Sequence, residues 1–143
     1  MIVIDSLDTT FRQMDLWYRS ILGSYLFEAE RMELDRCLEA YFGAHLVQIG
    51  GPSETFLFEK SPILHRVRLS PEYASVFRGP CVQGLVNHVP FLPESIDLIL
   101  MPHVLEFISR PAELFRQCST VLVPEGHLII LGFNPFSLWG LAK

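Results

Sequence analysis

Apolar residues recur in this chain with two different periods, and the change falls near Gly43. Before that point they repeat at helical spacing, which predicts a helix over residues 10–22. Gly23 is expected to interrupt the helix. Ser24 is expected to cap a second one, which runs from about Tyr25 to Phe42. The chain therefore begins with a helical lead-in.

After Gly43 the pattern changes to short apolar runs of strand length, and helical segments fit between several of them. Strands that alternate with helices predict an α/β fold: a Rossmann-like, doubly wound parallel sheet of about five strands. The prediction is one domain over residues 1–143, with N-terminal helices over 1–43 and an α/β core over 44–143. The expected strands are Leu46–Ile49, Leu64–Leu69, Cys81–Val82, Ile96–Met101 and Leu128–Phe133, the expected helices are Pro71–Phe77, His103–Ile108 and Pro111–Leu122, and a turn is expected over Val123–Leu128.

Composition narrows the class of protein. Half of the 143 residues are hydrophobic and the mean hydropathy is +0.31, which fits strands buried on both faces. The net charge of -5 gives no support to nucleic-acid binding, which needs basic patches. The longest apolar tract, Leu128–Leu141, is too short to span a bilayer, and no secretory leader is visible. Three widely spaced cysteines indicate buried thiols in a reducing cytoplasm, without a disulfide framework or a metal site.

The stretch "HLVQIGGPSE", residues 45–54, joins a strand to two glycines. A strand that ends in glycines is how many α/β domains hold a nucleotide, at the carboxyl ends of the strands. The chain has neither G-x-x-x-x-G-K-[ST] nor G-x-G-x-x-G, so phosphate and dinucleotide loops are unsupported. By itself the stretch does not identify a ligand.

The second half carries a more specific pattern. Pro90-Phe91 precedes the strand Ile96-Asp97-Leu98-Ile99, and Val121-Leu122-Val123-Pro124-Glu125-Gly126 comes before the last strand. This run resembles type 11 class I S-adenosylmethionine-dependent methyltransferases, and "GFNPFSLWG" (132–140) resembles one bacterial subgroup. The resemblance covers roughly residues 21–141 and implies the fold, methyl transfer and S-adenosylmethionine as cofactor. That subgroup usually continues further, so we expect the core to lack the family's last strands.

The resemblance also places cofactor-binding positions. Gly50 stands at the family's first motif glycine, while Pro52 and Glu54 replace the later ones. Three family acids are replaced, and we expect Glu54 or Glu72 to substitute for one of them. The positions that the resemblance assigns to the cofactor are Gln48, Gly50, Gly51, Arg68, Leu85 and Pro102, of which Gln48, Arg68 and Leu85 stand where the family has acids.

After the fourth strand, His103 and Glu106 occupy the region that faces the transferred methyl and the acceptor in this fold. His103 is the candidate general base, because an imidazole titrates near neutral pH. The alternative is a polar residue that opens a helix. Trp17 and Tyr18 either cover the cofactor pocket or pack in the core.

Two functions remain open. The first is methyl transfer to an acceptor that the sequence does not identify. The second is a catalytically inactive fold that serves as a binding or interaction module, which the replaced acids favour. We further expect an uncovered strand at the sheet edge, and a homodimer formed through it.

Overall fold

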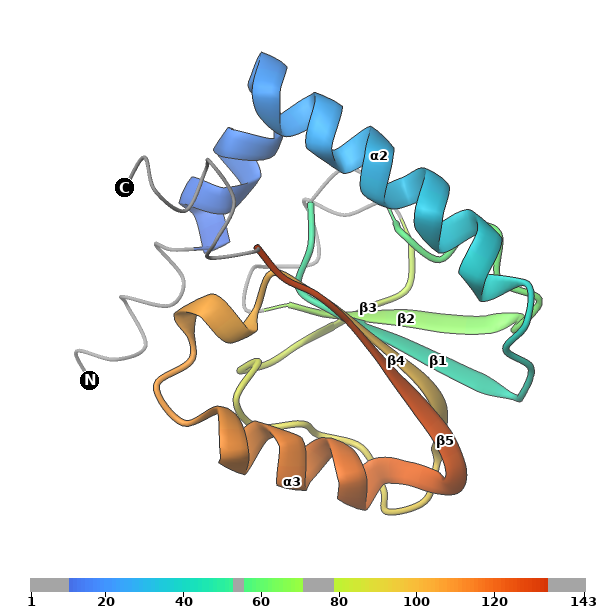
Figure 1. Cartoon of the computed structure of the whole chain (residues 1–143). Helices are drawn as coiled ribbons and strands as arrows, with labels where there is room; N and C mark the ends of the chain where they lie inside the picture. The colour runs from blue at the N-terminus through green and yellow to red at the C-terminus, as the bar shows by residue number, and fades with distance from the viewer. Residues whose placement is uncertain (1–10, 53–55, 71–78, 134–143) are drawn as a thin grey trace.

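The computed structural model describes residues 11–52, 56–70 and 79–133. Five parallel strands form one sheet in the order β3-β2-β1-β4-β5 (Figure 1). The order reverses between β1 and β4, which is the arrangement of a doubly wound sheet. The strands are β1 (His45–Ile49), β2 (His65–Ser70), β3 (Cys81–Gln83), β4 (Ile96–Pro102) and β5 (Leu122–Leu131).

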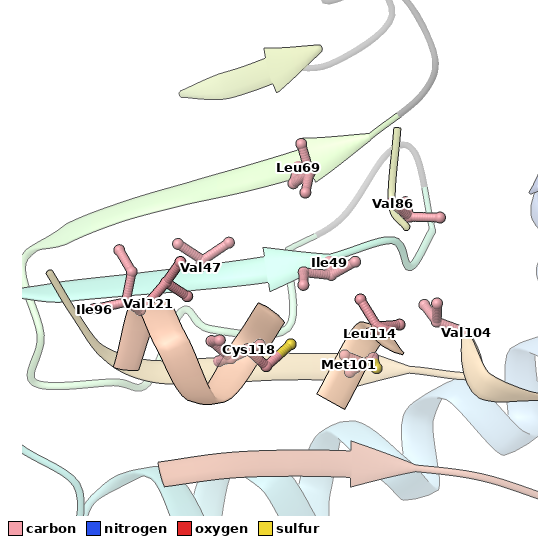
Figure 2. Packing of buried hydrophobic residues seen from close by; sticks show 11 residues of the cluster. Val47, Ile49, Leu69, Val86, Ile96, Met101, Val104, Leu114, Cys118 and Val121 are labelled. Carbon is pink, nitrogen blue, oxygen red and sulfur yellow. The ribbon is translucent and has the colours of Figure 1, made fainter. Parts of the chain in front are cut away.

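Helices cover both faces of the sheet. Helix α2 (Ile21–Leu38) lies on one face and α3 (Pro111–Val121) on the other, while a helix over residues 11–18 sits near the ends of the strands (Figure 1). Neighbouring residues of a strand point to opposite faces, so each face has its own core. Figure 2 shows the core on the α3 side, where Val121 of α3 lies near Val47 of β1 and Leu114 lies near Ile49. The α2 core contains Leu34, Leu38, Leu46, Leu57, Phe58, Ile63, Leu98 and Leu100.

This architecture confirms the predicted Rossmann-like parallel sheet. Each expected strand is present, because continuous apolar runs are what a sheet buried on both faces requires. The expected helix over Pro111–Leu122 is also present, with Pro111 in its first turn, where the missing N–H costs nothing.

The first N-terminal helix ends earlier than predicted, and the second both begins and ends earlier. The first covers residues 11–18, and α2 begins at Ile21 with Ser20, not Ser24, as its cap. The Ser20 hydroxyl accepts a hydrogen bond from the N–H of Gly23 at 3.1 Å. The expectation that Gly23 interrupts a helix is wrong. A Cβ there would lie 2.0 Å from the Trp17 carbonyl oxygen, so glycine allows the two helices to approach closely.

Two further local predictions need correction. The predicted turn over Val123–Leu128 lies within β5, where the pairing with β4 changes register. A local irregularity of the strand, rather than a turn, accommodates these residues. The predicted helix over His103–Ile108 shrinks to one 3-10 turn, η2 (Leu105–Phe107).

Some predictions fall outside the described residues: the helix over 71–77, Glu54, Glu72 and the subgroup motif beyond Phe133. The division into residues 1–43 and 44–143, with the last family strands missing, stays a prediction. None of the helices in the described part of the chain has the length and apolarity needed to cross a membrane.

Candidate functional site

The candidate site lies at the carboxyl ends of the strands, beside the point where the strand order reverses. The loop after β1 and the segment after β4 meet there, because β1 and β4 are paired. The helix over residues 11–18 packs against both segments. Phe11 approaches the position of Gly50, and the Tyr18 ring lies 6.2 Å from the His103 ring, centroid to centroid.

The loop after β1 depends on two glycines. Gly50 and Gly51 have φ angles of +75° and +94°, in the left-handed region that other residues rarely adopt. A Cβ on Gly50 would lie 2.9 Å from both the Phe11 ring and Val104 Cγ2. The Gly50 N–H donates to the Leu69 carbonyl of β2 at 3.0 Å. Both backbone angle and space therefore require glycine at position 50.

The buried side chain of Gln48 hydrogen-bonds to the backbone of this loop. Its side chain is fully buried, its Nε2 donates to the Gly50 carbonyl at 2.9 Å, and its Oε1 accepts from the Leu57 N–H at 2.9 Å. The amide uses its ability to donate and to accept at once. An ionised carboxylate here could not donate to Gly50. The replacement of the family acid by glutamine thus has a structural reason, and the assignment of Gln48 to the cofactor stays a prediction.

Arg68 lies beside Gln48 in the register of β2 against β1. Its side chain is fully buried, and the guanidinium carbon lies 4.7 Å from the centroid of the Phe56 ring. A guanidinium over an aromatic face gains cation–π attraction. Arginine only donates hydrogen bonds, so it cannot accept from a ribose hydroxyl as a carboxylate does.

The two remaining predicted cofactor positions, Pro102 and Leu85, differ in burial and in the contacts that their side chains can make. Pro102 is buried at the end of β4, and its Cγ would lie 3.1 Å from a Cβ on Gly51. Pro102 therefore belongs to the same contact region as the glycine loop. Leu85 follows β3, is 39% exposed and carries no hydrogen-bonding side-chain atom. The structure thus brings Gln48, Gly50, Gly51 and Pro102 together, and Leu85 cannot make the polar contact of the acid it replaces.

His103 comes directly after β4 and is a non-glycine residue with a left-handed φ of +51°. Its imidazole is 1% exposed and lies between two carboxylates. The Nε2 is 2.5 Å from Glu30 Oε1, and the Nδ1 is 3.2 Å from Glu106 Oε1. Glu106 Oε1 also accepts from the Phe133 N–H at 2.9 Å. His103 thus links α2, η2 and the segment after β5.

The two carboxylates decide the charge of this imidazole. Burial opposes the charged form, but the hydrogen bonds and negative charges of Glu106 and Glu30 outweigh it and raise the pKa of His103 to about 9. Burial likewise opposes ionisation of Glu106, yet its bonds to His103 and to the Phe133 N–H hold the Glu106 pKa below its usual value. At neutral pH the imidazole is charged and has no lone pair to accept a proton. The general-base assignment of His103 stays a prediction that this arrangement does not favour.

Sequence reasoning missed Glu30 and left the role of Tyr18 open. Glu30 lies 73 residues before His103, on what reads as a polar stretch of a surface helix. The sequence left two roles for Tyr18, covering the cofactor pocket or packing in the core. In the structure its ring packs beside the His103 ring. Pairings between residues so distant in sequence appear only when the fold is known. Among the described residues, no three His, Cys, Asp or Glu side chains gather as a metal site.

Comparisons with known proteins give a family for the chain and one relative of similar sequence. A family model described as "Methyltransferase domain" matches residues 59–130. The uncharacterized protein YafS of Escherichia coli (strain K12) is 33% identical over 129 residues, which are 90% of this chain and 52% of YafS. The chain therefore spans about half the length of this curated relative.

Solved structures share the fold at low identity. A SAM-dependent methyltransferase from Thermotoga maritima superposes with a TM-score of 0.65 at 17% identity, over 90% of this chain and 66% of that one. A SAM-dependent methyltransferase from Aquifex aeolicus gives a TM-score of 0.57 at 12% identity, over 75% and 65%. The chain thus shares its overall fold with these structures.

Proposed function

Because this chain belongs to the methyltransferase domain family, we propose that it is the cofactor-binding part of an S-adenosylmethionine-dependent methyltransferase. Membership of the family implies S-adenosylmethionine as the cofactor. The observation that carries the proposal is the glycine loop after β1, which meets the end of β4 at the switch point of the sheet. The acceptor is not specified by family or fold.

Two glycines in the loop after β1 support the proposal, although the positions of the family's acids carry other residues. Gly50 and Gly51 carry no side chain of their own, and the positions that a Cβ would take are lined by Phe11, Val104, Gln48 and Pro102. The left-handed backbone of both glycines is typical of loops that approach a cofactor closely. Together with buried Ser70 at the end of β2, they are the residues that would hold the cofactor. When bound, S-adenosylmethionine supplies a methyl group on a positively charged sulfonium. The protein's contribution is binding and orientation.

The contacts to the ribose and adenine must differ from the usual ones, because positions 48, 68 and 85 carry no carboxylate. A hydrogen bond to a charged acceptor contributes about 1.5–3 kcal/mol. Losing two of them weakens binding by about a hundredfold or more, since 1.4 kcal/mol is tenfold. We therefore expect weaker cofactor binding than in a relative that keeps these acids.

The same replacements support a competing function, a fold that binds a partner and no longer transfers methyl groups. Thermal unfolding of the full chain with S-adenosylmethionine or S-adenosylhomocysteine separates the two. A ligand at 100 times its Kd adds about 2.7 kcal/mol of stability, which raises the Tm by several degrees. Adenosine triphosphate serves as the matched control. No shift at millimolar S-adenosylhomocysteine would favour the binding module.

Assembly and location belong to the proposal as well. In the described part of the chain, β5 pairs with β4 on one side, which leaves an edge for a second copy. We place the protein in the cytoplasm, where Cys37, Cys81 and Cys118 stay reduced. Sedimentation analysis tests the dimer, and a monomer at micromolar concentration would contradict it.

A further inference from the structure

Four side chains gather beside the candidate site: Tyr18, Glu30, His103 and Glu106, named here the Tyr18–Glu30 cluster. They come from the helix over residues 11–18, from α2, from the end of β4 and from η2. The four residues come from different helices and strands, and Tyr18 and Glu30 are far from His103 and Glu106 in the sequence. The tertiary fold therefore brings them together.

Two of its polar atoms have no partner in the described structure. The Tyr18 hydroxyl and Glu30 Oε2 are both buried and make no hydrogen bond. Tyr18 is only 7% exposed, so water does not cover its hydroxyl from outside. Buried polar side-chain atoms in proteins are nearly always hydrogen-bonded, and an exception calls for an explanation such as a ligand. Glu30 Oε2 can only accept a hydrogen bond, so the missing partner of Glu30 is a donor.

The charge of the cluster defines that donor further. Glu30 and Glu106 flank the His103 ring, so two carboxylates share one imidazole. Counted with both carboxylates ionised and the imidazole protonated, the three groups carry one negative charge. A buried unbalanced charge is costly, and a cation that enters the cluster removes the imbalance. An anionic ligand would increase it. A neutral hydroxyl could bond to Glu30 but would leave the charge unbalanced.

Aromatic rings stand around the same place. Trp17 lies 5.6 Å from Tyr18 and 5.8 Å from Phe133, Phe27 lies 6.1 Å from Tyr18, and Phe133 lies 4.2 Å from His103, each between ring centroids. Aromatic faces attract cations, most strongly where water is excluded. Carboxylate, hydroxyl and aromatic faces together are suited to a protonated amine.

We propose that the Tyr18–Glu30 cluster binds the amino group of the methyl acceptor, so that the acceptor is an amine. That the bound amine is the methyl acceptor rests on the proposed function. The amine site itself rests on the unpartnered oxygens, the net charge and the aromatic rings. Glu30 Oε2 accepts a hydrogen bond from the ammonium and would take its proton, since only the neutral amine has a lone pair for a methyl group. The Tyr18 hydroxyl fixes the position of the nitrogen. His103 is a positioning residue, because it holds Glu30 in place and keeps its second oxygen available.

Three probes of one shape test the charge preference: benzylamine, benzyl alcohol and benzoate. Each is titrated into the full chain at pH 7 by calorimetry, with and without S-adenosylhomocysteine. Benzylamine is expected to bind saturably and at least tenfold more tightly than benzyl alcohol, and benzoate not at all. Equal binding of amine and alcohol, or no saturable binding of benzylamine, would overturn the inference.

Variants locate the binding in the cluster. Glu30→Gln keeps an acceptor for His103 and removes the charge, so benzylamine should bind at least tenfold more weakly. Glu33→Gln is the matched control on the same helix, because Glu33 is 73% exposed and pairs only with surface Arg36 in the described structure. Tyr18→Phe removes one unpartnered oxygen and should weaken benzylamine binding severalfold in a folded protein. Unchanged benzylamine affinity in Tyr18→Phe and Glu30→Gln would contradict the site.

The titration of S-adenosylhomocysteine in the same samples separates the two proposals. If it binds while benzylamine does not, the amine site fails and the proposed function stands. If benzylamine binds through Glu30 while S-adenosylhomocysteine does not bind, the amine site stands and the proposed function fails.

Discussion

The imidazole Nε2 of His103 lies 2.5 Å from Glu30 Oε1, although the two residues are 73 positions apart in the chain. This contact fastens the lead-in helix α2 to the end of β4, where the sheet presents its candidate site. A buried ion pair of this kind is weak evidence for stability on its own, because desolvation offsets the attraction. Its clearer consequences concern pH and the unpartnered oxygens beside it.

Stability is expected to depend on pH through His103. The folded-state pKa of about 9 lies above the ordinary value of 6.5, so the folded protein holds the proton more tightly. The contribution is fully present below pH 6.5 and is lost as pH rises through 9. It amounts to about 3 kcal/mol, at 1.36 kcal/mol per pKa unit. Urea unfolding between pH 6 and 10 measures it.

The control for this dependence is His103→Asn, because asparagine tolerates the left-handed φ of position 103. Groups outside the Tyr18–Glu30 cluster titrate equally in both proteins. The wild type should therefore lose more stability than the variant between pH 7 and 10. Parallel pH profiles would show that His103 is not held by Glu30 and Glu106.

Tyr18→Phe should stabilise the ligand-free protein. The Tyr18 hydroxyl is buried without a hydrogen bond in the described structure, and such a group costs about 1–3 kcal/mol. We expect a gain of about 1 kcal/mol in the free energy of unfolding, measured in urea. Tyr25→Phe is the control, since Tyr25 is 74% exposed and should change little. A loss of stability in Tyr18→Phe would mean that the hydroxyl has a partner.

Gln48→Glu should destabilise the protein although it restores the family's acid. Glutamate keeps the bond from the Leu57 N–H, but its second oxygen then faces the Gly50 carbonyl without a proton. We expect a loss of about 2–3 kcal/mol at pH 7. Burial and the nearby carbonyl raise the pKa of the new carboxyl, so the loss should shrink as pH falls.

The matched control is Gln13→Glu, an exposed position in the first helix, which should change stability little. If Gln48→Glu is as stable as the wild type at pH 7, the hydrogen bond from Gln48 to the Gly50 carbonyl is not what holds the loop after β1.

Gly50→Ala should destabilise by about 2 kcal/mol or more. A left-handed alanine costs about 1–2 kcal/mol, and its Cβ would lie 2.9 Å from Phe11 and Val104. Gly132→Ala is the control, because the nearest side-chain atom would be 3.5 Å from its Cβ. Thermal unfolding compares them; equal Tm values would show that the loop relaxes around a side chain at position 50.

Regular elements of the fold could be predicted because local patterns encode them. Continuous apolar runs predict β1 and β4, and Pro111 marks the start of α3. Gly23 misled the prediction, since a helical glycine and a helix break look alike until the neighbouring Trp17 carbonyl is seen. The irregularity in β5 looked like a turn for the same reason: proline and glycine punctuate both.

The candidate site was predictable in position but not in chemistry. Motif resemblance placed Gly50 and His103 at the carboxyl edge of the sheet, where the structure has them. It could not reveal that Gln48 of β1 bonds to the loop that follows its strand, nor that Glu30 reaches His103 from α2. No repeating pattern in the sequence signals such side-chain contacts, so they appear only once the fold is known.

The most direct measurement of the central claim is the amide NMR spectrum of the full chain titrated with S-adenosylhomocysteine. We predict saturable shifts at the carboxyl edge of the sheet, at Gly50, Gly51 and His103. No shifts are expected at Glu94 and Thr120, which line a cavity of about 590 Å³ beside β5. No shifts at millimolar ligand, or shifts confined to Glu94 and Thr120, would contradict a cofactor site at the glycine loop.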